Sequence, residues 1–239
     1  MYVFSDPQSR GYVRITGLFY LGIVIAGGFA IAYVPSQIVV QGDALATVAN
    51  ITQRSGLYHL GIAADALVML FEMMALTMLY FMFRPVSATL SFAAAMARLS
   101  MVAVMAAMLF FHAGAELLAQ PDAILPSFSE TQRAEIAALL LEMHRAGVWI
   151  WQVFFAFHLF LLGTLVRASG RFPQIIGFGL MVGSFGYLLD SVYAFAFPEV
   201  AWLGALRVGL LAIVTLSEVT FALWMLVRTP AGQPATAQA

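Results

Sequence analysis

The chain has 239 residues, of which 62% are hydrophobic and only 10% are charged, whereas about a quarter of the residues of a soluble domain are charged. This composition predicts an integral membrane protein, and the formal net charge of -1 provides no basic surface for nucleic acid. The sequence contains no cysteine and no lysine. Disulfides, thiolate metal ligands, c-type haem attachment and lysine Schiff bases are therefore excluded.

Six stretches are long and apolar enough to cross a bilayer, which takes about 20 residues of helix. They cover roughly residues 11–34, 57–83, 86–118, 146–166, 173–197 and 201–227. We therefore expect an all-α fold in which residues 1–228 form a single domain, a bundle of six transmembrane helices. Residues 229–239 lack helical periodicity and are rich in Pro, Gly, Ala, Thr and Gln, which predicts a disordered tail.

The first apolar stretch has a second interpretation. Arg10 and Arg14 precede it and Ala30-Ile31-Ala32 lies near its end, a pattern that a cleavable signal peptide also shows. The apolar run is longer, and its charged flank weaker, than in a signal peptide. We expect the stretch to be retained as the first transmembrane helix.

The connecting segments carry helix start and stop signals. Gly42-Asp43 predicts the N-cap of a short surface helix over residues 44–54. Pro85 ends the second transmembrane helix, because proline has no backbone N–H to donate and restricts the residue before it. Ser129 and Gln132 predict a capping box that opens a helix leading into the fourth transmembrane stretch.

Arginines and acidic residues fall in different sets of loops. Loops on one side contain Arg10, Arg14, Arg84, Arg167, Arg171 and Arg228. The opposite loops contain Asp43, Asp122, Glu130, Glu135 and Glu199, with only Arg54 and Arg133 as basic members. Because positively charged loops stay in the cytoplasm, this asymmetry predicts a multi-pass protein of the cell inner membrane with both termini cytoplasmic.

Several short motifs occur in a recognisable order along the chain. They are RITGLFYL from Arg14, Gly42-Asp43, Ala49-Asn50-Ile51, Gly61 to Asp65, Arg84-Pro85-Val86 and Gly186 to Ser191. This order resembles a bacterial multi-pass membrane family catalogued as domain of unknown function 4386. The resemblance covers residues 10–228 and implies the multi-pass topology. Asp65 and Asp190 are positions that match the family. The resemblance implies no substrate, cofactor or catalytic residue.

Charged residues and histidines lie within the predicted transmembrane helices, where each charge costs a few kcal/mol unless it has a partner or a cavity. These residues are Asp65 and Glu72 on the second helix, Arg98 and His112 on the third, His158 on the fourth, Asp190 on the fifth, and Arg207 and Glu218 on the sixth. At about 100° per residue, the polar residues of one helix fall on one stripe. We expect these stripes to face a common interior.

Depth along the helices suggests partners for these groups. Glu72 and Arg98 lie at similar depth on neighbouring helices, and Asp190 and Arg207 flank the turn at Pro198. Either pair neutralises charge in the bundle or contacts a ligand. Asp65 and Glu218 are left without an arginine. Glu218 matches His158 in depth, which predicts a hydrogen-bonded couple that relays a proton or only joins two helices.

The histidines suggest two cofactors. His144 and His158 are spaced like the ligands of b-type cytochromes, but the third helix has no histidine at the level of His158, so the set of haem ligands is incomplete. His59, His112 and His144 approach the outer face and suggest a zinc site with Glu116 and Glu142 nearby. Neither pattern is a local signature such as His-Glu-x-x-His, and we expect no cofactor.

Three classes of function remain open. The first is the binding or transport of a small solute, ion or proton, in which Asp65, Asp190 and Arg207 hold the ligand, Glu72 and Arg98 close the inner side, and His158 and Glu218 relay protons. The second is a membrane-embedded metal-dependent hydrolase that uses His59, His112 and His144. The third is a non-catalytic structural or partner subunit. The expected partners are the lipid bilayer and a small molecule or ion, while the substrate and the oligomeric state stay open.

Overall fold

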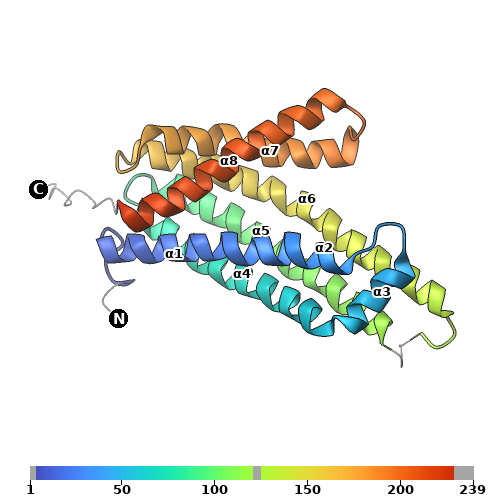
Figure 1. The fold of residues 1–239 in the computed structure, drawn as a ribbon. Helices are drawn as coiled ribbons and strands as arrows, with labels where there is room; N and C mark the ends of the chain where they lie inside the picture. The colour runs from blue at the N-terminus through green and yellow to red at the C-terminus, as the bar shows by residue number, and fades with distance from the viewer. Residues whose placement is uncertain (1–3, 121–124, 229–239) are drawn as a thin grey trace, which may run out of the picture. The chain divides into compact units, whose positions relative to one another are not determined.

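The structure is a computed structural model that describes residues 4–120 and 125–228 (Figure 1). Every regular element among these residues is helical. In chain order they are α1 (Arg10–Gly27), the π-helix η2 (Gly28–Tyr33), α2 (Val34–Ile38), α3 (Ala44–Gln53), α4 (Ser55–Phe83), α5 (Ala88–Ala119), α6 (Glu130–Ala168), α7 (Gln174–Ala196) and α8 (Ala201–Val227). The predicted all-α fold is confirmed, and the predicted tail lies outside the described residues.

Six helical stretches are long and apolar enough to cross a membrane. They are Arg10–Ile38, Ser55–Phe83, Ala88–Ala119, Glu130–Ala168, Gln174–Ala196 and Ala201–Val227. Each contains or closely matches one of the six stretches predicted from the sequence, so the multi-pass class is confirmed. The orientation of the termini stays a prediction.

The predicted helix caps are present. The side chain of Asp43 accepts a hydrogen bond of 2.9 Å from the backbone N–H of Ala46 at the start of α3. Before α6, the N–H of Ser129 donates to the side-chain oxygen of Gln132 at 2.9 Å, and the N–H of Gln132 donates to Ser129 Oγ at 3.2 Å. These bonds use backbone donors that lack partners within a helix.

The first transmembrane stretch is not a regular α-helix. The six residues of η2 form a π-helix between α1 and α2. A π segment has a wider turn than an α-helix, and such segments occur frequently at functional sites. Pro35 follows in the first turn of α2, where its missing N–H is tolerated.

The described residues form two compact units. Unit 1 takes its residues from Met1–Gly22, Phe71–Met101 and Gln152–Ala239, and unit 2 comprises Ile23–Leu70 and Val102–Trp151. Four long helices, α1, α4, α5 and α6, contribute residues to both units. The single domain expected from the sequence stays a prediction.

In unit 1, glycines allow α7 and α8 to pack closely. A Cβ atom added at Gly183 would lie 2.6 Å from the backbone nitrogen of Val214, and one added at Gly186 would lie 2.7 Å from that of Leu211. Real Cβ atoms do not approach other atoms this closely. The helices therefore meet backbone to backbone, as small residues permit in membrane bundles.

Arg171, in the turn between α6 and α7, fixes the segment that precedes α1. Its Nη1 donates a hydrogen bond of 2.6 Å to the side-chain oxygen of Gln8. The side-chain nitrogen of Gln8 in turn donates to the carbonyl of Met82 at 3.1 Å. Burial lowers the pKa of Arg171 below its ordinary value, while the negative charge of Asp6 acts in the opposite direction.

In unit 2, a buried apolar cluster joins the ends of five helices. Its members are Val34, Ile38, Ile51, Tyr58, Ala115, Leu118, Ala119, Ala137 and Leu141. Elsewhere large apolar side chains face outward, as Phe110 does with 79% exposure. Outward apolar groups and inward polar groups are the distribution that a bilayer requires.

Candidate functional site

Unit 2 brings together three side chains that can ligate a metal ion. Asp65 on α4, His112 on α5 and His144 on α6 each offer one donor atom, and the three atoms lie within 4.8 Å of one another. The distance from His144 Nε2 to an oxygen of Asp65 is 4.0 Å. Asp65 is buried, with 7% exposure, and the two histidines are half-buried.

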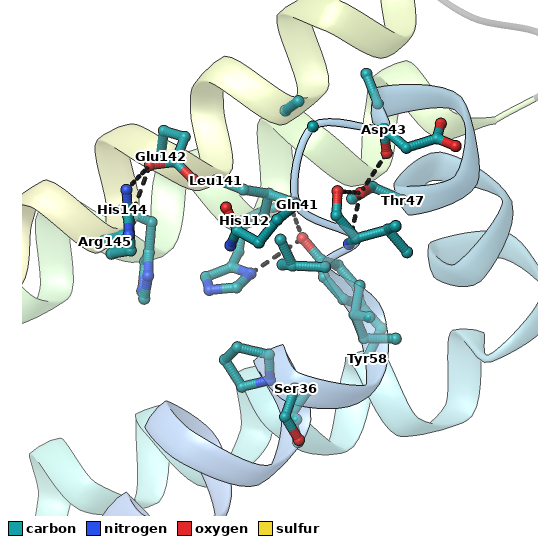
Figure 2. A pocket seen from close by; sticks show the side chains of 18 of the residues that line it. Ser36, Gln41, Asp43, Thr47, Tyr58, His112, Leu141, Glu142, His144 and Arg145 are labelled. Atoms are coloured by element: carbon teal, nitrogen blue, oxygen red, sulfur yellow. Dashed lines mark hydrogen bonds and ion pairs between the residues drawn. The ribbon is translucent and has the colours of Figure 1, made fainter.

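Tyr58 determines which nitrogen of His112 is available. The Tyr58 hydroxyl donates to the backbone carbonyl of His112 at 2.9 Å and lies 3.0 Å from Nδ1 of the same residue (Figure 2). A hydroxyl has one proton, so when the carbonyl takes it Nδ1 must be the donor in the second bond. His112 Nε2 then has a lone pair, which is the tautomer that binds a metal.

The spacing of the three donors is compatible with a metal ion after a small contraction. Zinc bonds nitrogen and oxygen at about 2.0–2.2 Å in a tetrahedron, which places neighbouring donors about 3.3 Å apart. Donors within 4.8 Å therefore have to move inward by about 1 Å or less. One carboxylate and two imidazoles, with room for a fourth ligand, match the donor set of hydrolytic zinc centres.

The alternative b-type haem, in which His112 would oppose His144 across the iron, does not fit the contact between these two rings. The ring centroids of His112 and His144 are 4.0 Å apart, with the rings at 71° to each other. Two imidazoles that ligate one haem lie on opposite faces of the macrocycle, with the iron between them. The present geometry has no space for such a plane between these rings.

His59, which the sequence grouped with His112 and His144, is not part of this cluster. Its imidazole contacts the carboxylate of Glu116, and its side chain is 58% exposed. Asp65 takes the third position instead, because Asp65 lies on the inward stripe of α4 while His59 is about 120° away from that stripe. The predicted trio therefore differs from the observed cluster by one residue.

A cavity of about 630 Å³ adjoins the two histidines of the cluster (Figure 2). Its wall is formed by the end of the first transmembrane stretch, the loop before α3, the start of α3, and the first half of α6, together with Tyr58 and His112. Ligand sites in proteins have volumes of about 300–1,000 Å³. A small molecule that enters this cavity reaches His112 and His144.

A smaller void lies beside the same cluster. It has a volume of about 10 Å³ and is lined by Asp65 and His144, with Met69, Met105 and Met108 among the other neighbours. This is about the space that one water molecule needs. The cluster therefore borders both a large cavity and a space for one water molecule, and His144 lines both.

Unit 1 contains a separate group of buried polar side chains centred on Arg98, which is completely buried. Its guanidinium contacts the carboxylate of Glu72 and lies 3.0 Å from Nε2 of His158. Because arginine only donates, His158 Nε2 must accept, and His158 Nδ1 donates to the carbonyl of Ala94 at 2.8 Å. The pair of Glu72 and Arg98 predicted from helix depth is present.

Glu218 in unit 1 is held by two tyrosines. The hydroxyl of Tyr20 donates to one carboxylate oxygen at 2.8 Å, and that of Tyr187 donates to the other at 3.2 Å. The predicted hydrogen bond between Glu218 and His158 is wrong, because both side chains use other partners. Equal depth does not specify which way a helix is rotated, and the rotation directs His158 toward Arg98.

Asp190 and Arg207 also form the predicted pair in unit 1. Their side chains are in direct contact, and the Arg207 guanidinium lies 4.3 Å from the ring centroid of Tyr193. The neighbouring Ser191 donates to the side-chain oxygen of Gln152 at 3.4 Å. A role for Asp190 and Arg207 in ligand binding stays a prediction.

Sequence reasoning missed the tyrosines of both polar groups. Tyr20, Tyr58 and Tyr187 are uncharged, so a search for charges within apolar helices passes over them. Their positions carry a usable signal, because each falls inside an apolar run, where a buried hydroxyl requires a hydrogen-bond partner.

These features define a helical multi-pass membrane protein with buried polar centres. The chain belongs to the family described as Domain of unknown function (DUF4386), whose model matches residues 15–229. This confirms the resemblance inferred from the sequence motifs.

An "Uncharacterized protein" of Archaeoglobus fulgidus is 34% identical to the chain over 76 residues. That match covers 32% of this chain and 42% of the relative, so it spans less than half of the relative's length. No solved structure is detectably similar to the chain.

Proposed function

We propose that this protein is a membrane-embedded, metal-dependent hydrolase that binds zinc through Asp65, His112 and His144. The observation that carries the proposal is the convergence of these three donors, from three helices, within 4.8 Å of one another beside a cavity of about 630 Å³. Of the three classes of function that the sequence leaves open, this cluster and its cavity favour the metal-dependent hydrolase.

The chemistry follows from the donor set. Zinc held by three protein ligands keeps a position for water, lowers the pKa of that water and polarises a substrate carbonyl. The protein residues would orient the donors: the bonds of Tyr58 would keep Nε2 of His112 free for the metal, and the buried Asp65 would supply the one carboxylate of the ligand set. A molecule in the cavity meets His112 and His144 on the wall.

Metal analysis of the purified protein tests the proposal. We expect about one zinc ion per chain in the wild type and its loss in His112→Ala and His144→Ala. His59→Ala is the matched control, because His59 lies outside the cluster, and it should retain the metal. Tyr58→Phe should bind zinc at least about 10-fold more weakly, since it removes the hydrogen bond that orients His112.

Three results would contradict this function. A metal-free wild type would remove it. Zinc that persists in both histidine variants would place the metal elsewhere. Iron in place of zinc would also count against hydrolysis, because two histidines and one carboxylate are the ligand set of non-haem iron oxygenases.

A second candidate is the movement of a proton or an ion through unit 1. The observation that favours it is Glu218, whose only hydrogen bonds among the described residues are with Tyr20 and Tyr187. Arg98, the completely buried arginine of unit 1, contacts Glu72 instead. Carboxyl groups inside transmembrane bundles commonly mark proton and ion paths.

Proteoliposomes with a pH-sensitive dye inside test this candidate. An imposed potential should drive proton uptake in the wild type, and Glu218→Gln should reduce the rate at least about 10-fold, because the amide cannot exchange a proton. Glu199→Gln, at an exposed position before α8, is the control. Equal rates in the wild type and Glu218→Gln would eliminate this candidate.

A further inference from the structure

The cavity of unit 2 has an apolar wall that begins in the first transmembrane stretch. Ile31 of η2, Val34 and Ile38 of α2, and Leu141 and Val148 of α6 all line it. Ile31 is also 41% exposed, and it belongs to a helical stretch that is apolar enough to cross a membrane, so the cavity begins within a transmembrane segment. An alkyl chain is the ligand chemistry that fits such a wall.

The charged side chains that line the same cavity are mostly acidic. Among the described lining residues, Asp43, Glu135 and Glu142 are carboxylates, and Arg145 is the one arginine. The guanidinium of Arg145 donates to the carboxylate of Glu142, with Nε at 2.9 Å and Nη2 in direct contact. This pair neutralises itself (Figure 2), which leaves Asp43 and Glu135 without a cation in the cavity.

Asp43 and Glu135, the two carboxylates without a cation in the cavity, favour ligands with some head groups over others. A negative charge brought into an acidic cavity is repelled, whereas a positive charge is attracted. Asp43 also caps α3, because its side chain accepts a hydrogen bond from the backbone N–H of Ala46. Electrostatic complementarity of this kind supplies specificity more than raw affinity.

We propose that the substrate is an amphiphile from the bilayer with a hydrolysable ester or amide and a cationic or neutral head group. This inference rests on the hydrolase function proposed above. Its alkyl chain lies along Ile31, Val34 and Val148, its carbonyl reaches His112 and His144, and its head group lies near Asp43 and Glu135. Hydrolysis adds water across the acyl bond and releases a fatty acid with an alcohol or amine. Amphiphiles with anionic head groups bind more weakly.

Binding of non-hydrolysable probes tests the head-group preference without depending on metal. Alkyltrimethylammonium and alkyl sulfonate of equal chain length are titrated into the full-length protein in nanodiscs, with empty nanodiscs as the blank. We expect the cationic probe to bind at least about 10-fold more tightly than the anionic one. The same preference should persist in His112→Ala, which separates the charge of the cavity from the presence of a metal.

The acidic residues provide a matched set of variants. Asp43→Asn with Glu135→Gln should reduce the preference to less than about 3-fold, and asparagine keeps the cap of α3. Glu130→Gln, on the first turn of α6 and outside the cavity lining, should leave the preference unchanged. Equal binding of both probes, or tighter binding of the sulfonate, would overturn the proposed substrate class even if the zinc site is confirmed.

Hydrolysis of matched esters completes the test. Zinc-loaded protein should cleave a choline-type alkyl ester with a kcat/KM at least about 10-fold above that of the sulfonate ester with the same chain. A protein that binds the cationic probe selectively but contains no metal would refute the hydrolase and keep the ligand class. A protein that contains zinc and cleaves both esters equally would keep the hydrolase and refute the ligand class.

Discussion

Substitution of Arg98 by methionine is expected to lower the free energy of unfolding by about 3–5 kcal/mol, because it leaves a buried charge without its partner. Glu72 is 3% exposed and contacts the Arg98 guanidinium directly. His158 also loses the donor to its Nε2. Unfolding of the purified protein in mixed micelles, followed by circular dichroism, measures the loss.

Two further variants show whether the pair itself is responsible. Arg84→Met, at an exposed position between α4 and α5, should change stability by no more than about 0.5 kcal/mol. The double variant Arg98→Met with Glu72→Met should recover much of the stability, since it removes both charges. A double variant as unstable as Arg98→Met alone would show that packing, rather than charge, accounts for the effect.

Gly183→Ala should destabilise the contact between α7 and α8 by about 2 kcal/mol, in the range measured when a packed interior receives an extra carbon. The added Cβ would lie 2.6 Å from the Val214 backbone nitrogen and 2.7 Å from its Cα. Backbone atoms cannot move aside as a flexible side chain can, so the two helices would have to separate. The same unfolding measurement detects this change.

Gly209→Ala is the matched control for this substitution. Gly209 lies within α8, and a Cβ added there meets nothing within 4 Å. Because alanine favours a helix over glycine by about 1 kcal/mol, this variant should be neutral or more stable. If both alanine variants behave alike, the close approach of α7 and α8 does not exist.

The sequence was sufficient to predict the six long apolar helices. Apolar length located all six long helices, and the motif Ser129 to Gln132 located the start of α6, which then runs on without a break. The π-helix η2 was not predictable, because its residues are apolar and hydropathy does not distinguish an α turn from a π turn.

Pairing in the polar groups was only partly predictable. Depth along antiparallel neighbours was enough for Glu72 with Arg98, where two opposite charges attract strongly. It failed for His158 and Glu218, because the rotation of each helix and the nearby tyrosines decide their contacts. Asp65 joins His112 and His144 for the same reason: helix rotation, not proximity to the membrane surface, selects the third donor.

The helix α6 is longer than the hydrocarbon core of a membrane is thick. Its 39 residues extend about 58 Å at 1.5 Å per residue, nearly twice the roughly 30 Å of a bilayer's hydrocarbon core. About half of the helix therefore extends past the hydrocarbon core. The charged residues of α6, Glu130, Arg133, Glu135, Glu142 and Arg145, all lie in its first half apart from Arg167 in its last turn, so the apolar second half is the part that a bilayer covers, and the first half continues beyond it.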